Sequence, residues 1–393
     1  MPRGVAAEKL AWLRLARSPG IGPRSHARLI ERFGSAVAAL AALPGLLATG
    51  RWPGVALAPE EDVLAELAAI EAGSVQLLLR SDPAYPRLLR EIADAPPVLL
   101  ARGRTELLAG PSVAIVGARN ASAHGRLLAA QLGRQLAAAG LTVVSGLARG
   151  IDTSAHEGAL EGTGSTVAVL ASGVDVAYPE ENEALLERIA VAGCALSERP
   201  LGAAPQARHF PRRNRIIAGL TLGIVVVEAA PQSGSLITAR LALEEGREVM
   251  AVPGSPLDPR HRGTNQLLRE GAALVESAAD VLRALGPLVT ASVPAPRRAS
   301  GPATPERVPP EPAAVSGRGE RMPARDRPTA VQGRDGDPAE QLLGSLGVEP
   351  VAIDDLARQC QISPAVIQEA VLELELAGRI ERHPGNRIAR RAG

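Results

Sequence analysis

The chain has 393 residues, 46% of them hydrophobic and 22% charged, which provides material for more than one buried core and excludes a disordered or fibrous protein. Its 43 basic residues nearly balance its 42 acidic ones, so the formal charge is +1 and a protein that is basic over its whole surface is excluded. Any site for an anionic partner must therefore be local.

Aromatic and lysine residues are scarce. Only 2% of the residues are aromatic, so the cores must be aliphatic, and an aromatic ring in a polar stretch needs a reason. Lys9 is the only lysine. Arginine suits bidentate phosphate contacts, and an arginine-biased genome explains its excess equally well.

Cysteine and histidine usage indicates no redox or metal chemistry. Cys194 and Cys360 are too far apart for a disulfide framework or a thiolate site, which favours a reducing compartment. The six histidines lack metal-ligand spacing, and we expect neither a metal nor a cofactor. Neither a signal peptide nor an apolar run of roughly 18 residues is present, so we expect a cytoplasmic protein with no membrane partner.

Residues 1–75 are predicted to form a small helical domain of the SAM or helix-hairpin-helix kind. Apolar positions recur at helical spacing in residues 10–15, 26–33 and 63–70. Residues 19–23, with sequence PGIGP, resemble a helix-hairpin-helix turn, whose backbone N–H groups can meet a DNA phosphate. A tight turn between two packed helices explains the same residues.

Residues 76–287 are predicted to form an α/β domain with a doubly wound, mostly parallel, Rossmann-like sheet. Short apolar runs, each followed by a turn with glycine, alternate with amphipathic stretches, as buried parallel strands require. These runs cover residues 113–116, 141–144, 166–170, 223–227 and 248–252. Such sheets bind ligands at the carboxyl ends of their strands, so function is sought there.

The rest of the chain is predicted to be a tether and a winged-helix domain. Residues 288–336 are rich in Pro, Arg, Gly and Ser and are expected to be disordered. In residues 337–393, three helical patterns (339–346, 353–360 and 364–376) precede a two-stranded wing over 378–388 with a turn at Pro384-Gly385.

The loop after the first run contains Gly117, Arg119 and Ser122. It is not the dinucleotide fingerprint, because Arg119 stands where a second glycine would admit a pyrophosphate. The guanidinium, the Ser122 hydroxyl and the N–H groups at the following helix start suit a backbone phosphate. The alternative is an ordinary helix start with a surface arginine.

The loop after the second run contains Gly146, Arg149 and Gly150. The glycines permit close backbone approach, and Arg149 is a second phosphate donor. Asp152 and His156, four residues apart, are interpreted as scaffold rather than as catalytic groups.

A third landmark covers residues 210–217, with sequence FPRRNRII. Single-stranded nucleic acid needs guanidinium groups for its phosphates and a ring for its bases, and the candidates here are Phe210, Arg212, Arg213 and Asn214. The alternative places Phe210 in the core and pairs the arginines with acidic neighbours such as Glu228.

A fourth landmark is the helix start with Ser233 and Ser235, whose hydroxyls can cap free N–H groups or share them with a phosphate. Some glycosidic-bond enzymes use a related glycine-rich start with a nearby carboxylate. No second carboxylate is evident beside Glu228 for acid–base work.

The order and spacing of these motifs resemble the DprA/Smf family of bacterial DNA-processing proteins. The resemblance covers residues 80–285, from the segment 81–86 (SDPAYP) to 251–254 (AVPG), and weaker motifs extend it to both terminal domains. It implies an extended Rossmann-like domain that binds single-stranded DNA, forms a homodimer and helps to load RecA recombinase while displacing single-strand-binding protein. No catalytic activity is implied.

The resemblance also implies roles for particular residues. Arg119 and Ser122 would hold phosphate in the first loop, Arg149 and Gly150 would do so in the second, and the strand would be flanked by Phe210, Arg213 and Asn214. Ala118 stands where the family often has serine, which removes one hydroxyl contact.

We therefore expect a non-enzymatic protein that binds single-stranded DNA in natural transformation. Two alternatives stay open. The first is a nucleotide phosphoribohydrolase-like enzyme with Glu228 acting near Arg119. The second is a transcription regulator that acts through the winged helix, although residues 364–376 carry no arginine.

Overall fold

The computed structural model describes residues 3–48, 54–163 and 165–292, and in the C-terminal region residues 346, 351–352, 356, 367, 370–371, 374, 379–383 and 387–390. The chain forms two compact units, one of residues 1–45 with 54–296 and one of residues 46–53 with 297–393. The predicted linker lies outside the described residues, except that helix α12 (Ala278–Ser292) includes its first positions.

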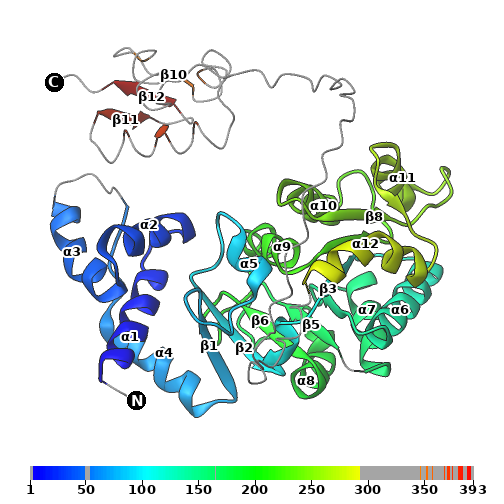
Figure 1. The fold of residues 1–393 in the computed structure, drawn as a ribbon, viewed down its shortest axis with the longest axis horizontal. Coiled ribbons are helices and arrows are strands. Elements are labelled where there is room, and N and C mark those ends of the chain that lie inside the picture. The colour runs from blue at the N-terminus through cyan, green and yellow to red at the C-terminus, as the bar shows by residue number, and fades with distance from the viewer. Residues whose placement is uncertain are drawn as a thin grey trace, which may run out of the picture. The chain divides into compact units, whose positions relative to one another are not determined.

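A nine-stranded sheet organises the first unit (Figure 1). Its strands are β1 (Val75–Leu79), β2 (Val98–Gly103), β3 (Ser112–Val116), β4 (Thr142–Ser145), β5 (Thr166–Val169), β6 (Cys194–Ser197), β7 (Gly223–Val226), β8 (Glu248–Ala251) and β9 (Ala273–Leu274). All five predicted runs are strands, each within about one residue of the expected bounds. In this sheet, the strands that lie outside the predicted runs are β1, β2, β6 and β9.

The strand order is β1-β2-β6-β5-β4-β3-β7-β8-β9, and strands β3 to β9 pair parallel to one another. Only β2 runs against its neighbours, so that β1 and β2 extend the sheet beyond β6. The extended, mostly parallel, Rossmann-like sheet is thereby confirmed. Strands β4, β5 and β6 lie on one side of β3, and β7 lies on its other side. This change of side makes the position between β3 and β7 a topological switch point, where doubly wound sheets have a crevice at the carboxyl ends of their strands.

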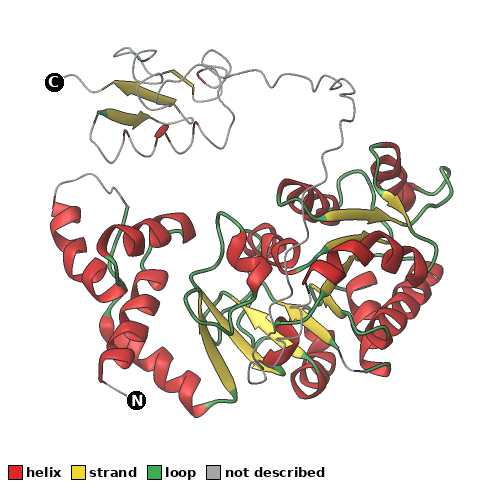
Figure 2. Ribbon diagram, in the orientation of Figure 1, coloured by secondary structure: helices red, strands yellow, loops and turns green. Residues whose placement is uncertain are grey.

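Helices cover both faces of the sheet (Figure 2). One face packs against α5 (Arg87–Glu91), α9 (His209–Leu220), α10 (Gly234–Glu244) and α11 (Arg262–Arg269). The other packs against α6 (Ala123–Ala138), α7 (Ile151–Glu161), α8 (Glu183–Ala192) and α12. Alternate side chains of β3 serve the two cores, with Ala114 in one and Ile115 in the other, which is why the strand sequence is continuously apolar.

The N-terminal helices are α1 (Arg3–Arg17), α2 (Pro23–Phe33), α3 (Ala36–Ala48) and α4 (Glu60–Ala72). The three predicted helical stretches lie in α1, α2 and α4, whereas α3 was missed because its alanine-rich sequence has little periodicity. Trp12 Nε1 donates to Pro97 O at 2.7 Å and Arg17 Nη1 donates to Glu198 O at 2.9 Å, which joins α1 to the sheet domain.

The described residues of the second unit include β10 (Val351–Ala352), β11 (Ile380–His383) and β12 (Arg387–Arg390). Strands β11 and β12 pair antiparallel, with His383 opposite Arg387, which confirms the predicted wing. Its turn at Pro384-Gly385 lies outside the described residues, as do most positions of the three predicted helices.

Among the described residues, no single helix is long and apolar enough to cross a membrane. Helices α2 and α3 meet that criterion only together, as a pair bent by 104°.

Candidate nucleic-acid interface

The carboxyl ends of β3, β4, β5 and β6 bring four loops to one edge of the sheet. The first two loops carry Arg119 and Arg149, and the loop after β5 carries Tyr178. Helix α9, which connects β6 to β7, begins at this same edge and supplies Phe210. The parallel topology thus gathers residues that are almost one hundred positions apart in sequence.

Arg119, Phe210 and Tyr178 form a platform of one cation and two rings. The Arg119 guanidinium carbon lies 5.1 Å from the centroid of the Phe210 ring, within the range of a cation–π contact. The Phe210 and Tyr178 rings meet edge to face, with their centroids 5.4 Å apart. Tyr178 is 44% exposed and Arg119 is also exposed. Tyr178 is not among the binding residues predicted from the sequence, and its contact with Phe210 becomes evident only in the fold.

Arg149 is exposed but already has an anionic partner. Its Nε and Nη2 atoms donate to the two carboxylate oxygens of Glu181, both at 2.7 Å. The two side chains are 61% and 53% exposed, and such a surface pair is worth about 0 to 1 kcal/mol. A phosphate can therefore take the place of Glu181 at little cost.

Gly150 holds the first two loops together. It has a φ of +77°, and a Cβ at this position would lie 2.4 Å from Ala118 O. Only glycine suits both the backbone conformation and this contact. The Ile151 N–H also donates to Ala118 O at 3.3 Å, so the loop that carries Arg119 is fixed against the start of α7.

Arg213, predicted to flank a DNA strand, is buried, with only 5% of its surface exposed. Burial lowers its pKa to about 10, and the charge of Asp152 opposes that shift, so Arg213 is a cation at neutral pH. Burial raises the pKa of Asp152, whose Oδ2 accepts from Gly146 N at 3.1 Å. A direct contact of Arg213 with DNA stays a prediction. The burial of the side chain disfavours it.

Gly146 was expected to give DNA a close approach, and the structure gives that space to Arg213. A Cβ on Gly146 would lie 1.4 Å from Arg213 Nη1, so the guanidinium occupies the volume of the missing side chain. His156 is fully buried and pairs with Thr166 Oγ1 at 2.8 Å through Nδ1. Asp152 and His156 are both buried, as expected for scaffold residues.

A group of cations near the start of α9 extends the positive surface. Arg208 and Arg212 are exposed, whereas Arg199, which follows β6, is half-buried. Burial lowers the pKa of Arg199, and the charges of Arg17, Arg212 and Arg208 lower it further, against the opposing effect of Glu198. Arg212 is among the residues predicted from the sequence. Arg199 and Arg208 are not, because they belong to no motif and only the fold brings them close to Arg212.

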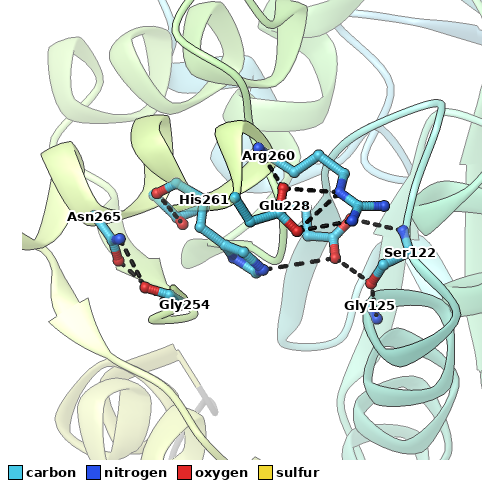
Figure 3. A network of polar contacts seen from close by, with 9 residues as sticks. Ser122, Gly125, Glu228, Gly254, Arg260, His261 and Asn265 are labelled. Carbon is cyan, nitrogen blue, oxygen red and sulfur yellow. Dashed lines mark hydrogen bonds and ion pairs between the residues drawn. The ribbon is translucent and has the colours of Figure 1, made fainter. Parts of the chain in front are cut away.

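The first-loop serine binds a carboxylate of the protein itself (Figure 3). Ser122 donates through its N–H and its hydroxyl to the two oxygens of Glu228, at 3.0 and 2.5 Å. Ser122 was predicted to bind a phosphate, and Glu228 now fills that position. Glu228 is 0% exposed, so a substrate has no access to its carboxylate. This burial disfavours the alternative in which Glu228 acts as the acid or base of an enzyme.

The remaining predicted residues lie at the start of α10. Ser233 is its N-cap, with Oγ accepting from Ser235 N at 3.4 Å and lying 2.7 Å from Ser235 Oγ. Asn214 Nδ2 donates to Gly234 O at 3.4 Å, which ties α9 to α10. Ser235 is buried and Asn214 and Ser233 are half-buried, so capping explains the serines without a phosphate.

Three family models match successive parts of the chain. The model described as DNA recombination-mediator protein A matches residues 76–286, which is more than half of the chain. The chain belongs to this family. The DprA-like N-terminal HHH domain matches residues 6–69 and the DprA winged helix domain matches residues 323–386, so the DprA/Smf resemblance is confirmed along the chain.

Individual relatives support the same membership. Protein Smf of Synechocystis is 34% identical over 405 residues, covering 98% of this chain and 99% of the relative. DNA processing protein DprA of Streptococcus pneumoniae is 48% identical over 201 residues, covering 51% of this chain and 71% of the relative.

Two solved structures of the family share this fold. The pneumococcal DprA structure, 43% identical, has a TM-score of 0.54 over 57% of this chain and 78% of its own. The DNA processing protein A of Helicobacter pylori, 30% identical, has a TM-score of 0.50 over 54% of this chain and 96% of its own. A single-stranded DNA binding mode has been described for the Helicobacter protein.

Proposed function

We propose that this chain binds single-stranded DNA at the carboxyl edge of its sheet, without reading its sequence. The observation that carries the proposal is the platform of Arg119, Phe210 and Tyr178, where an exposed guanidinium lies over one ring and a second ring is 44% exposed. Bases of a single strand stack on such rings, and phosphates bind the neighbouring cations.

The platform favours a single strand over a duplex because paired bases keep their faces stacked within the helix. Arg149, Arg212, Arg208 and Arg199 provide cations beside the platform. Buried Arg213 adds a positive charge that interacts with that of Arg119. Contacts to several phosphates release counterions, so the affinity should fall steeply as the salt concentration rises.

We further propose that the protein acts in the cytoplasm as a homodimer, without catalysis, and helps to load RecA recombinase onto single strands taken up in transformation. Membership of a family described as DNA recombination-mediator protein A supports the role in recombination, and the description of the Helicobacter relative supports binding of single strands. The burial of Glu228 supports the absence of catalysis, because the enzymatic alternative requires its carboxylate to reach a substrate.

Competition between DNA forms tests the binding site. We expect the full-length chain to prefer an oligothymidine strand to a duplex of equal length, and Arg119→Ala to weaken single-strand binding about tenfold. Arg32→Ala is a matched control, because Arg32 is exposed and its guanidinium carbon lies 5.4 Å from the Phe33 ring, in the N-terminal helices. Equal losses in both variants would contradict the assignment.

The recombinase part of the proposal needs a separate assay. RecA filament assembly is measured on single strands coated with single-strand-binding protein. The wild-type chain should shorten the lag before assembly, and Arg119→Ala should do so less than Arg32→Ala. A wild-type chain that leaves the lag unchanged while still binding the strand would overturn RecA loading and leave DNA binding intact.

A further inference from the structure

The buried carboxylate of Glu228 follows β7 and lies at the N-terminus of α6 (Figure 3). Its Oε2 accepts from the Ser122 N–H at 3.0 Å and its Oε1 accepts from the Ser122 hydroxyl at 2.5 Å. The Ser122 oxygen in turn accepts from Gly125 N at 2.9 Å. The negative group thus binds to donors at the positive end of the helix dipole.

This position is the switch point of the sheet. Strands β3 and β7 are neighbours there, and α6 follows β3 directly. In doubly wound sheets the N-terminus of this helix is where the phosphate of a nucleotide binds. The Glu228 carboxylate therefore occupies the place of a nucleotide phosphate.

The surrounding residues are built to admit the carboxylate. A Cβ on Gly125 would lie 2.5 Å from Glu228 Oε1, so a side chain there would displace it. Gly125 thus has the role that a glycine plays towards a phosphate in a nucleotide site, with the ligand replaced by a residue of the chain. A soluble anion that bound here would need the same donors of Ser122.

Two further side chains fill the crevice. The Ile151 side chain lies 2.6 Å from where a Cβ of Gly117 would be, so the start of α7 packs directly on the loop that follows β3. His261 Nε2 lies 3.9 Å from Glu228 Oε1. The His261 ring is seated against Gly254, whose backbone is held by Asn265 through bonds of 3.2 and 2.8 Å.

We propose that Glu228 is an internal anion that excludes nucleotide phosphates from the switch-point crevice and so determines that this sheet does not serve as a mononucleotide site. A tethered carboxylate needs no loss of translational freedom to bind, so a free phosphate competes poorly for the same donors. Anion binding is thereby left to the arginines at the outer edge of the sheet.

Removal of the carboxylate should uncover the site. Inorganic phosphate and AMP are titrated calorimetrically, at constant ionic strength, into the full-length wild-type chain, Glu228→Ala and Glu187→Ala. Glu187→Ala removes an equal charge from a surface pair with Arg102 and is the matched control. We expect Glu228→Ala to bind phosphate about tenfold more tightly than the other two proteins. Equal affinity in all three would overturn the proposal.

If the Glu228→Ala chain folds poorly, the melting temperature of a second variant tests the same proposal. Glu228→Ser removes the charge and opens the volume of the carboxylate, while it keeps a polar side chain at this position. Phosphate at constant ionic strength is expected to raise the melting temperature of Glu228→Ser and leave that of wild type and Glu187→Ala unchanged, because a ligand stabilises the state that binds it. An equal response of all three would overturn the proposal. No DNA is present, so failure here leaves the proposed function standing.

Discussion

The guanidinium carbon of Arg119 lies 5.1 Å from the centroid of the Phe210 ring, although the two residues belong to loops at the ends of different strands. Arg119 follows β3, and Phe210 is the second residue of α9. The contact orients the guanidinium and leaves its N–H groups for an anion. It also places one hydrogen-bond donor for a phosphate beside one ring on which a base can stack. Each nucleotide of single-stranded DNA presents one phosphate and one base, so the pair matches both groups.

Loss of the Phe210 ring should weaken binding of single strands. Stacking of a base on an aromatic ring is worth about 1 to 3 kcal/mol, so we expect Phe210→Ala to lower the affinity about tenfold or more. Phe210→Tyr keeps a ring and should retain most of the affinity. Fluorescence anisotropy with a labelled oligothymidine measures both. Equal losses in the two variants would show that the ring face is not what binds.

The pair between Arg149 and Glu181 should compete with DNA. Glu181→Gln releases the guanidinium, and because an exposed pair is worth about 0 to 1 kcal/mol, the affinity for a single strand should rise up to about fivefold. The control is Glu187→Gln, which breaks a comparable pair with Arg102 on β2. An identical gain in the control would mean that net charge, rather than release of Arg149, is responsible.

A methyl group on Gly146 should destabilise the fold. Its Cβ would lie 1.4 Å from Arg213 Nη1, which forces the buried guanidinium away from Asp152. We expect Gly146→Ala to lower the free energy of unfolding by about 3 kcal/mol, as for other losses of a buried charge partner. Gly110→Ala is the control, since nothing lies within 4 Å of its Cβ. Urea unfolding that is unchanged in Gly146→Ala would refute this packing.

Acidification should destabilise the sheet domain through His156. Burial lowers the pKa of His156 to about 3, against about 6.5 in an unfolded chain. Between these pH values the unfolded state binds a proton that the native state does not, so stability is present above pH 6.5 and is lost as the pH falls. The loss is about 1.4 kcal/mol per pH unit.

Urea unfolding between pH 7 and pH 4.5 measures this dependence. His156→Gln should lose less stability on acidification than the wild-type chain, whereas His124→Gln, on an exposed position of α6, should keep the wild-type slope. A wild-type slope in His156→Gln would assign the acid sensitivity to other groups. His26 is one of these, because burial lowers its pKa to about 4.

The parallel core and its loops could be predicted because β-branched runs and glycine turns are local signals. Strands such as β6, with sequence CALS, carry no such signal and form because the sheet pairs them on both sides. Similarly, the arginines at the strand ends were evident, but their burial was not. Arg119 follows β3 and Arg213 lies in the first half of α9, and only the fold shows that the first is exposed and the second buried.

The role of Glu228 could not be predicted for the same reason. Its sequence distance from Ser122 is 106 residues, and nothing local indicates that the two share hydrogen bonds. At the position where a phosphate is expected, the structure places the carboxylate of Glu228. The identity of that group depends on the strand order, which places β7 beside β3.

The position of the strand is tested most directly by photocrosslinking. An oligothymidine carrying 5-iodouracil is bound to the full-length chain, irradiated, and its attachment sites are mapped by mass spectrometry. We predict crosslinks at Phe210 and Tyr178, with loss of the Phe210 crosslink in Phe210→Leu and retention of binding in Arg32→Ala. Crosslinks confined to the N-terminal helices or to residues 337–393 would contradict it.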